Sequence, residues 1–258
     1  MSSVAVAGAF GLAGLLALAA WRLRWLTADG AAAAAAVGGT VLGFGGWQVG
    51  AALAVFFVSG TVLTRVGRHR KRQPEHLRGG RDAGQVLGTG GVAAVAALAW
   101  GLQVLPDGVH AALVRAMLGA LAAAAADTWA AEVGMLSPSP PRLITTWAYV
   151  PAGTSGGVTL VGSLAGVAGA VLVAAVGAGR DPELFTAAWI AGTVGMLTDS
   201  LLGATVQAAY RLPDGTTSET PADGAAHVRG LRWMTNSTVN ALATLAGALT
   251  AVALGRIL

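Results

Sequence analysis

Acidic side chains inside apolar segments are the residues of this sequence best suited to chemistry. Asp127 and Glu132 end one long apolar run, and Asp199 lies inside another, with apolar residues still to follow. Carboxylates at membrane depth are costly to bury and usually serve a function. On a helix, Asp127 and Glu132 point roughly 140° apart, so they need not hold one ligand. The alternative is a structural carboxylate that pairs with Arg or accepts a hydrogen bond from Thr128 or Ser200.

A glycine-rich stretch begins at Pro151 and is followed by an apolar run from Gly157. A turn of this kind before a helix presents backbone N–H groups and the positive end of the helix dipole, which suits phosphate. We expect phosphate binding by Gly153, Thr154, Ser155, Gly156 and Gly157. The same residues fit Gly-x-Ser-x-Gly, but a Ser155 nucleophile would need His227 as its base, so a serine hydrolase is disfavoured.

Basic and amide side chains flank the same membrane edge. Arg81 and Gln85 close a basic loop, and a guanidinium placed there can clamp phosphate. Lys71 is the only lysine, and no P-loop motif surrounds it. Asn236 and Asn240 share one helix face, where amide oxygens can complete a Mg²⁺ shell, hold a polar substrate group or bond a neighbouring helix. The rest of the basic loop orients the chain or binds anionic lipid headgroups.

The elements that must position these residues are membrane helices. Of 258 residues, 55% are hydrophobic and only 11% charged, and the mean hydropathy is +0.66. This composition excludes a water-soluble globule and predicts one all-α membrane domain over 1–258 with about eight spans. The absence of Cys excludes disulfides, thiolate metal sites and iron–sulfur clusters. The net charge of +4 fits loop orientation, and no nucleic-acid-binding module is visible.

The apolar runs and the charges between them predict the topology. A glycine-rich turn at 43–46 separates two of the runs, and the first run has no Lys or Arg before it. Loops 22–29, 65–85, 133–156 and 208–235 then share one side, with two, seven, one and three of the sixteen Lys and Arg residues. The positive-inside rule makes that side cytoplasmic. A faint parallel repeat relates 79–128 to 153–200. The predicted spans are 4–20, 31–44, 47–64, 86–105, 109–126, 157–177, 184–207 and 236–257.

Several motifs in this order resemble the phytyl-phosphate kinase family of polytopic membrane proteins, which is distantly similar to CTP-dependent polyprenol kinases and lipid cytidylyltransferases. The likeness covers nearly the whole chain. The motifs are Arg81-x-x-x-Gln85-Val86, Ala126-Asp127-Thr128-Trp129-Ala130-x-Glu132-x-Gly134, Pro151-x-Gly153-Thr154-Ser155-Gly156-Gly157, Asp199-Ser200-Leu201-Leu202-Gly203-Ala204-Thr205-x-Gln207 and Asn236-x-x-x-Asn240.

The resemblance implies transfer of the γ-phosphoryl group of CTP, or another nucleoside triphosphate, to an isoprenyl monophosphate. Such chemistry depends mainly on positioning and charge neutralisation. Asp127, Glu132, Asp199 and Asn236 are then expected to bind Mg²⁺, with Asp127, Asp199 and Arg81 acting in catalysis. Gln85 and Lys71 join the glycine turn in binding the nucleotide. The remaining polar residues hold substrate or structure: Asn240, Ser200, Thr128 and Gln207.

Rival interpretations stay open at this stage. An isoprenoid alcohol kinase would use one carboxylate as a base, and a lipid cytidylyltransferase would direct attack to the α-phosphate of CTP. A secondary transporter would use the intramembrane Asp199 and the interrupted segment at 138–157. The least specific alternative is a structural membrane protein. We expect a bacterial inner-membrane location, a site facing the cytoplasm, and membrane lipids as surroundings, and the sequence leaves a homodimer open.

Overall fold

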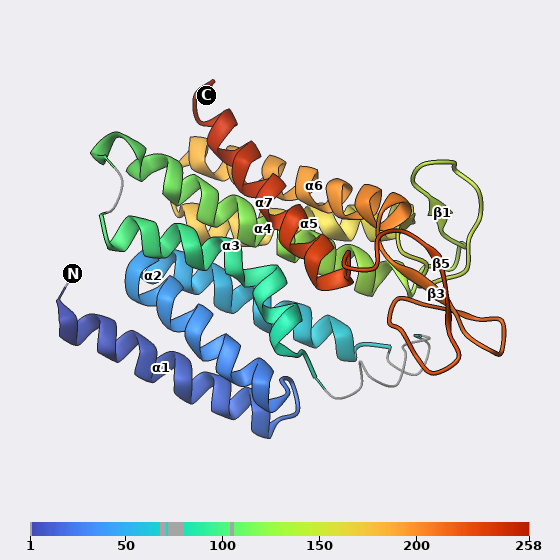
Figure 1. Cartoon of the computed structure of the whole chain (residues 1–258). Coiled ribbons are helices and arrows are strands. Elements are labelled where there is room, and N and C mark those ends of the chain that lie inside the picture. Colours follow the sequence, from blue (N-terminus) through green and yellow to red (C-terminus); the bar gives the residue numbers. More distant parts are fainter. Residues whose placement is uncertain (1, 68–70, 72–79, 104–105, 258) are drawn as a thin grey trace.

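The computed structural model describes residues 2–67, 71, 80–103 and 106–257. Its helices pack as one elongated bundle (Figure 1), and within these described residues seven helices are long and apolar enough to cross a membrane. This confirms the predicted all-α polytopic bundle. Arg68, Arg70, Arg72 and Arg78 of the basic loop lie outside the described residues. The seven helices are α1 (Ser3–Arg22), α2 (Ala28–Arg65), α3 (Ala83–Gly101), α4 (His110–Gly134), α5 (Leu160–Ala178), α6 (Pro182–Thr205) and α7 (Asn236–Leu254).

The helix α2 contains two of the predicted spans. Gly46 has φ +85° and ψ 174°, a conformation that breaks a helix and favours glycine. The chain reverses at Gly46. A Cβ on Gly50 would lie 3.3 Å from the Cβ of Leu42, and Figure 1 shows the two halves of α2 running back along each other. The turn expected at 43–46 is therefore present.

The helix α4 forms the centre of the bundle. All ten residues from Met117 to Ala126 are buried, and seven of them are Ala or Gly. Small side chains let neighbouring backbones approach closely: a Cβ on Gly166 of α5 would lie 2.8 Å from the Ala126 carbonyl oxygen of α4. Without a hydrophobic drive in lipid, such close packing is what holds membrane helices together. This packing positions the C-terminal end of α4, which carries the acidic residues Asp127 and Glu132.

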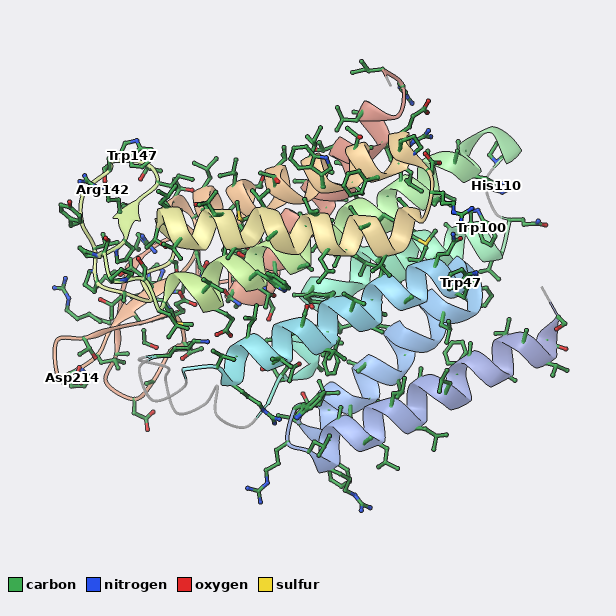
Figure 2. All side chains as sticks on the ribbon, turned by 180° about the vertical axis from the view of Figure 1, so that it is seen from behind. Trp47, Trp100, His110, Arg142, Trp147 and Asp214 are labelled. Carbon is green, nitrogen blue, oxygen red and sulfur yellow. The ribbon has the colours of Figure 1, made fainter. Side chains whose placement is uncertain are left out.

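The long loops gather at one end of the bundle, as predicted, and form two small antiparallel sheets (Figure 1). One sheet pairs β1 (Arg142–Leu143) with β2 (Gly157–Val158). The other has the order β4-β3-β5, with β3 at Ala209–Arg211, β4 at Thr217–Ser218 and β5 at Ala226–Arg229. In Figure 2, the labelled Arg142, Trp147 and Asp214 lie at this end, whereas Trp47, Trp100 and His110 lie at the other. A short 3₁₀ turn, η2 (Asp107–Val109), precedes α4 at that far end.

The helix α5 begins later than the sequence predicted. We expected a helix from Gly157, but Gly157 and Val158 form β2, and α5 starts at Leu160. Thr159 caps it by accepting a hydrogen bond from the Gly162 N–H at 3.0 Å, as a residue with a side-chain oxygen does at an N-cap. The glycine-rich turn is thus separated from the helix dipole by one short strand.

Candidate active site

A polar pocket opens at the loop end of the bundle. It lies between the C-terminal ends of α4 and α6 and the glycine-rich turn. Its volume is about 240 Å³. Asp127 of α4 and Asp199 of α6 line it, together with Ser200, Gln207 and Asn236. The whole turn from Gly153 to Gly157 lines it as well. The structure therefore brings together the glycine turn and two of the three carboxylates that the sequence singled out.

The two aspartates face one another across this pocket. Their carboxyl groups are close enough to share a hydrogen bond when one of them is protonated. The Asp199 Oδ2 atom is buried and has no hydrogen-bond partner among the described residues. A buried charged oxygen without a partner is costly. A cation bound between the two carboxylates would satisfy it.

The oxygen donors of the pocket suit Mg²⁺. Among the described residues, no cluster of three or more His, Cys, Asp or Glu side chains could hold a metal alone. Mg²⁺ does not need such a cluster, because it is usually held by one or two carboxylates, substrate phosphates and waters. Asp127 and Asp199 supply the carboxylates, and Asn236 lines the same pocket with an amide oxygen. The residues present fit this ion in complex with a phosphate ligand.

The glycine-rich turn has the backbone geometry of an anion site. Gly153 and Gly156 have φ of +87° and +79°, in the region that favours glycine. The backbone N–H groups of Ser155 and Gly156 form no hydrogen bond with any described residue. Successive backbone donors in such turns form concavities that bind phosphate. The turn packs tightly on α6, since a Cβ on Gly203 would lie 3.0 Å from the Gly156 nitrogen.

Glu219 is a pocket residue that the sequence analysis missed. It follows β4 and lines the pocket beside the aspartates, and the Ser155 hydroxyl donates a hydrogen bond to its Oε1. The hairpin carrying Glu219 thereby fixes the glycine turn. Nothing in the local sequence distinguishes Glu219 from a solvated loop residue, because only the β4-β3-β5 sheet brings it to the pocket.

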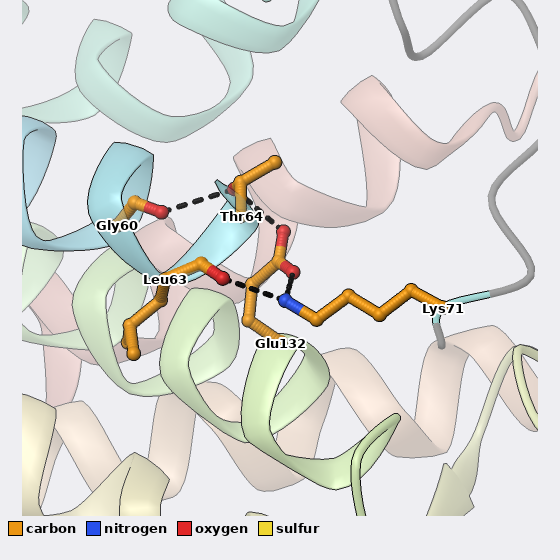
Figure 3. Close-up of polar contacts among 5 residues, drawn as sticks. All are labelled: Gly60, Leu63, Thr64, Lys71 and Glu132. Carbon is orange, nitrogen blue, oxygen red and sulfur yellow. Dashed lines mark hydrogen bonds and ion pairs between the residues drawn. The ribbon is translucent and has the colours of Figure 1, made fainter. Parts of the chain in front are cut away.

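Glu132 and Lys71 lie away from the pocket and bind each other (Figure 3). The Lys71 Nζ is 2.6 Å from the Glu132 Oε2 and 2.6 Å from the Leu63 carbonyl oxygen, and the Thr64 hydroxyl donates to the Glu132 Oε1 at 2.6 Å. The Lys71 side chain is fully buried and that of Glu132 is 11% exposed. The expected metal role of Glu132 and nucleotide role of Lys71 do not match this geometry. Glu132 lies on another face of α4 from Asp127, as the helix angle indicated.

Other predicted site residues also lie outside the lining of the pocket. The Gln85 side chain accepts from the Asp82 N–H in a capping box that starts α3. Asn240 lies beside Gly88 of α3. Thr128 faces α2, since a Cβ on Gly60 would lie 3.0 Å from the Thr128 Cγ2. The same point lies 2.9 Å from an Arg81 guanidinium nitrogen. Arg81 is therefore on the α2 side of α4, next to the residue that follows Asp127.

Comparison with known proteins identifies relatives across kingdoms. Protein PGR of Arabidopsis thaliana is 36% identical over 189 residues, and the match covers 63% of this chain and 65% of PGR. The uncharacterized membrane protein MJ0933 of Methanocaldococcus jannaschii is 34% identical over 192 residues, covering 74% of this chain and 78% of the relative. Protein VTE6, chloroplastic, of Arabidopsis thaliana is 25% identical over 206 residues, covering 78% of this chain and 56% of VTE6. No solved structure matches.

The family model supports the same relationship over more of the chain. The model described as integral membrane protein DUF92 matches residues 11–248. This range includes every motif on which the resemblance to the phytyl-phosphate kinases was based. The bundle, the motifs and the relatives agree, and the chain belongs to the DUF92 family of integral membrane proteins.

Proposed function

We propose that this protein transfers the γ-phosphoryl group of CTP to an isoprenyl, phytyl-like monophosphate and so makes the diphosphate. One observation carries the proposal: Asp127, Asp199 and the glycine turn with its free N–H groups line a single pocket at the loop end. Membership in the DUF92 family and the similarity to VTE6 give further support. The site is proposed to face the cytoplasm of a bacterial inner membrane, although one relative carries a chloroplastic name.

The charge of the pocket explains why a divalent cation is needed. Asp127, Asp199 and Glu219 line it, and no Lys, Arg or His does so among the described residues. A nucleoside triphosphate brings further negative charge and would be repelled. Mg²⁺ held by Asp127 and Asp199, with Asn236 beside them, would neutralise the phosphates and orient them.

The remaining groups bind and position the donor. The N–H groups of Ser155 and Gly156 donate hydrogen bonds to phosphate oxygens, which they can do because no acceptor in the described part of the chain occupies them. Glu219 accepts from the Ser155 hydroxyl and so fixes the turn. The N-terminus of α5 lies behind the turn, and Thr159, Gly162 and Ser163 at that terminus also line the pocket.

The acceptor requires little activation. A phosphate monoester with a second pKa of about 6 is largely a dianion at neutral pH. Its oxygen attacks the γ-phosphorus, the bond from that phosphorus to the β–γ bridging oxygen breaks, and CDP leaves. No proton has to be removed from the nucleophile. The absence of histidine from the described lining of the pocket is compatible with this reaction.

Product analysis tests the proposal against its rivals. Purified protein in detergent is incubated with Mg²⁺, an isoprenyl monophosphate and CTP labelled at either the α- or the γ-phosphate. We expect label in the lipid only from γ-labelled CTP, with CDP released. Lipid labelling from α-labelled CTP with release of pyrophosphate would indicate cytidylyltransfer. Label transfer in a parallel reaction with the free isoprenoid alcohol, and none with the monophosphate, would indicate an alcohol kinase. Either result would contradict the proposal.

A further inference from the structure

A second, larger cavity lies between α1, the two halves of α2 and α3. Its volume is about 340 Å³, and nearly all of its lining is apolar, including Leu16, Leu53, Phe56 and Phe57. Thr89 also lines it, but its hydroxyl already donates to the Gln85 carbonyl at 2.8 Å. The two other polar side chains are Arg81 and Trp25. We name this cavity the tail groove.

Two side-chain donors without a partner among the described residues line the tail groove at its loop end. The Trp25 Nε1 atom is buried and has no hydrogen-bond partner among the described residues. The Arg81 guanidinium lies 5.4 Å and 5.8 Å from the ring centroids of Phe56 and Phe57. It forms no hydrogen bond or ion pair within the described part of the chain. The Trp25 ring is itself 6.2 Å from that of Phe57, so both side chains lie near the same aromatic ring.

The backbone holds these two residues together. The Arg81 N–H donates to the Trp25 carbonyl at 3.0 Å, and the Thr27 N–H donates to the Arg81 carbonyl at 3.1 Å. The pairing joins the α1–α2 turn to the residues just before α3. The two donors are therefore preorganised, which lowers the entropy cost of binding a ligand there.

The described residues do not supply a counter-ion for Arg81. Glu132 acts on it electrostatically, but the Glu132 carboxylate is already bound to Lys71 and Thr64. An incompletely hydrated guanidinium without a partner is costly, and a planar fork of N–H donors matches phosphate. The donors at the end of an apolar cavity thus call for a ligand with an anionic head and an apolar chain.

We propose that the tail groove binds the isoprenyl chain of the acceptor and that Arg81 and Trp25 bind its phosphate. This inference rests on the proposed kinase function and names where its lipid substrate sits. A monophosphate dianion with a single chain fits one groove and one pair of donors. A bilayer phospholipid has a phosphodiester with one charge on that phosphate and two chains, and it fits less well.

The head of the tail groove and the polar pocket border the same turn of α4. The Arg81 guanidinium and the Thr128 methyl group meet at Gly60, and Asp127, the residue before Thr128, lines the pocket. The acceptor phosphate is therefore held against the turn of α4 that carries a catalytic carboxylate. In a bilayer the chain exchanges lipid contacts for protein contacts with little net gain. The headgroup contacts must accordingly determine affinity.

Photoaffinity labelling tests this proposal without requiring turnover. A diazirine-bearing isoprenyl monophosphate is added to the full chain in nanodiscs, and the labelled peptides are mapped by mass spectrometry. We expect labelling of α1, α2 and α3. Arg81→Gln should lower the labelling about tenfold, Arg81→Lys should restore part of it, and Trp25→Phe should lower it severalfold. Arg22→Gln, an exposed arginine outside the groove, and Trp21→Phe should leave it unchanged.

Controls separate this inference from the proposed function. Asp199→Asn should keep full labelling while losing phosphoryl transfer. If Asp199→Asn transfers phosphate normally, the proposed function fails even though the groove binds lipid. Four results would each overturn the groove assignment. Labelling could be confined to α4 and α6, or it could be equal in the wild type and Arg81→Gln. The probe alcohol could label as strongly as the probe monophosphate, or phosphatidylglycerol could compete as well as an isoprenyl monophosphate.

Discussion

Asp127 and Glu132 lie near the C-terminal end of α4, and the residues that each one contacts determine its role. Asp127 faces Asp199 across the polar pocket, whereas Glu132 hydrogen-bonds to the buried Lys71. The sequence places both carboxylates in one helix and cannot say which neighbours they meet. The angle of roughly 140° between them on a helix predicted that they would lie on different faces. The structure agrees with this angle and not with the shared Mg²⁺ role that the family resemblance implied.

The Lys71–Glu132 pair makes a structural prediction. Glu132→Gln leaves a fully buried ammonium without its counter-ion, which should destabilise the protein by about 3–5 kcal/mol and lower its melting temperature in detergent. The double variant Lys71→Met, Glu132→Leu should recover most of that stability, because both charges are removed. The Mg²⁺ concentration for half-maximal activity should not change in Glu132→Gln, and a marked rise would show that Glu132 is a metal ligand after all.

The Ser155–Glu219 contact makes a second prediction at the residue scale. Ser155→Ala removes a hydrogen bond to a charged group, which typically contributes about 1.5–3 kcal/mol. We expect the KM for CTP to rise roughly tenfold while kcat changes little, since Ser155 positions the turn. Initial rates at varied CTP concentration measure both constants. Complete loss of turnover with an unchanged KM would instead indicate a nucleophilic serine.

At the scale of elements, apolar length and glycine turns were readable from the sequence. The runs predicted the helices within a few residues, except that α4 continues to Gly134, beyond the predicted end at 126. Gly46 reverses the chain where the turn at 43–46 was expected. The start of α5 was not readable, because the β1–β2 pairing occupies Gly157 and Val158. Glu219 and the tail groove were equally hidden, since both depend on contacts between segments far apart in the chain.

The packing of the glycine turn on α6 can be tested with two matched substitutions. Gly156→Ala places a methyl group 2.7 Å from the Ala204 Cα, at a φ of +79°. Gly153→Ala has a similar φ of +87° but meets no atom within 4 Å. Either substitution should lower the free energy of unfolding by about 1–2 kcal/mol, because a residue with a Cβ is strained at a positive φ. Only Gly156→Ala should in addition displace the turn, so its melting temperature should fall several degrees further, and equal melting temperatures would contradict the packing.

At the scale of the whole molecule, the positive-inside rule and the fold agree on which loops lie together. The described parts of the loops that were predicted to share one side lie at one end of the bundle, and this end also carries the pocket (Figure 1). Threading the predicted spans alternately through the membrane could group these loops, and charge counting could say which side they occupy. Neither could show that their sheets complete the pocket.

The absence of cysteine makes orientation straightforward to measure. Single cysteines replace Ser139, an exposed residue at the loop end, or Arg180, an exposed residue at the opposite end. With a membrane-impermeant maleimide on intact bacterial cells expressing the protein, we expect Arg180→Cys to react at once. Ser139→Cys should react only after permeabilisation. The reverse pattern would place the pocket outside.

The most direct test of the central claim is phosphoryl transfer by Asp199→Asn. The substitution keeps the size of the side chain but removes the charge that we propose binds Mg²⁺ in the pocket. Asp214→Asn is the matched control, because Asp214 is exposed in the β3–β4 turn, where it accepts from the Thr216 hydroxyl. With γ-labelled CTP and an isoprenyl monophosphate, we predict that kcat/KM falls by about 10²–10³ in Asp199→Asn, as when a charge-stabilising group is lost, and stays within twofold in Asp214→Asn. Activity of Asp199→Asn within a few fold of the wild type would contradict the account.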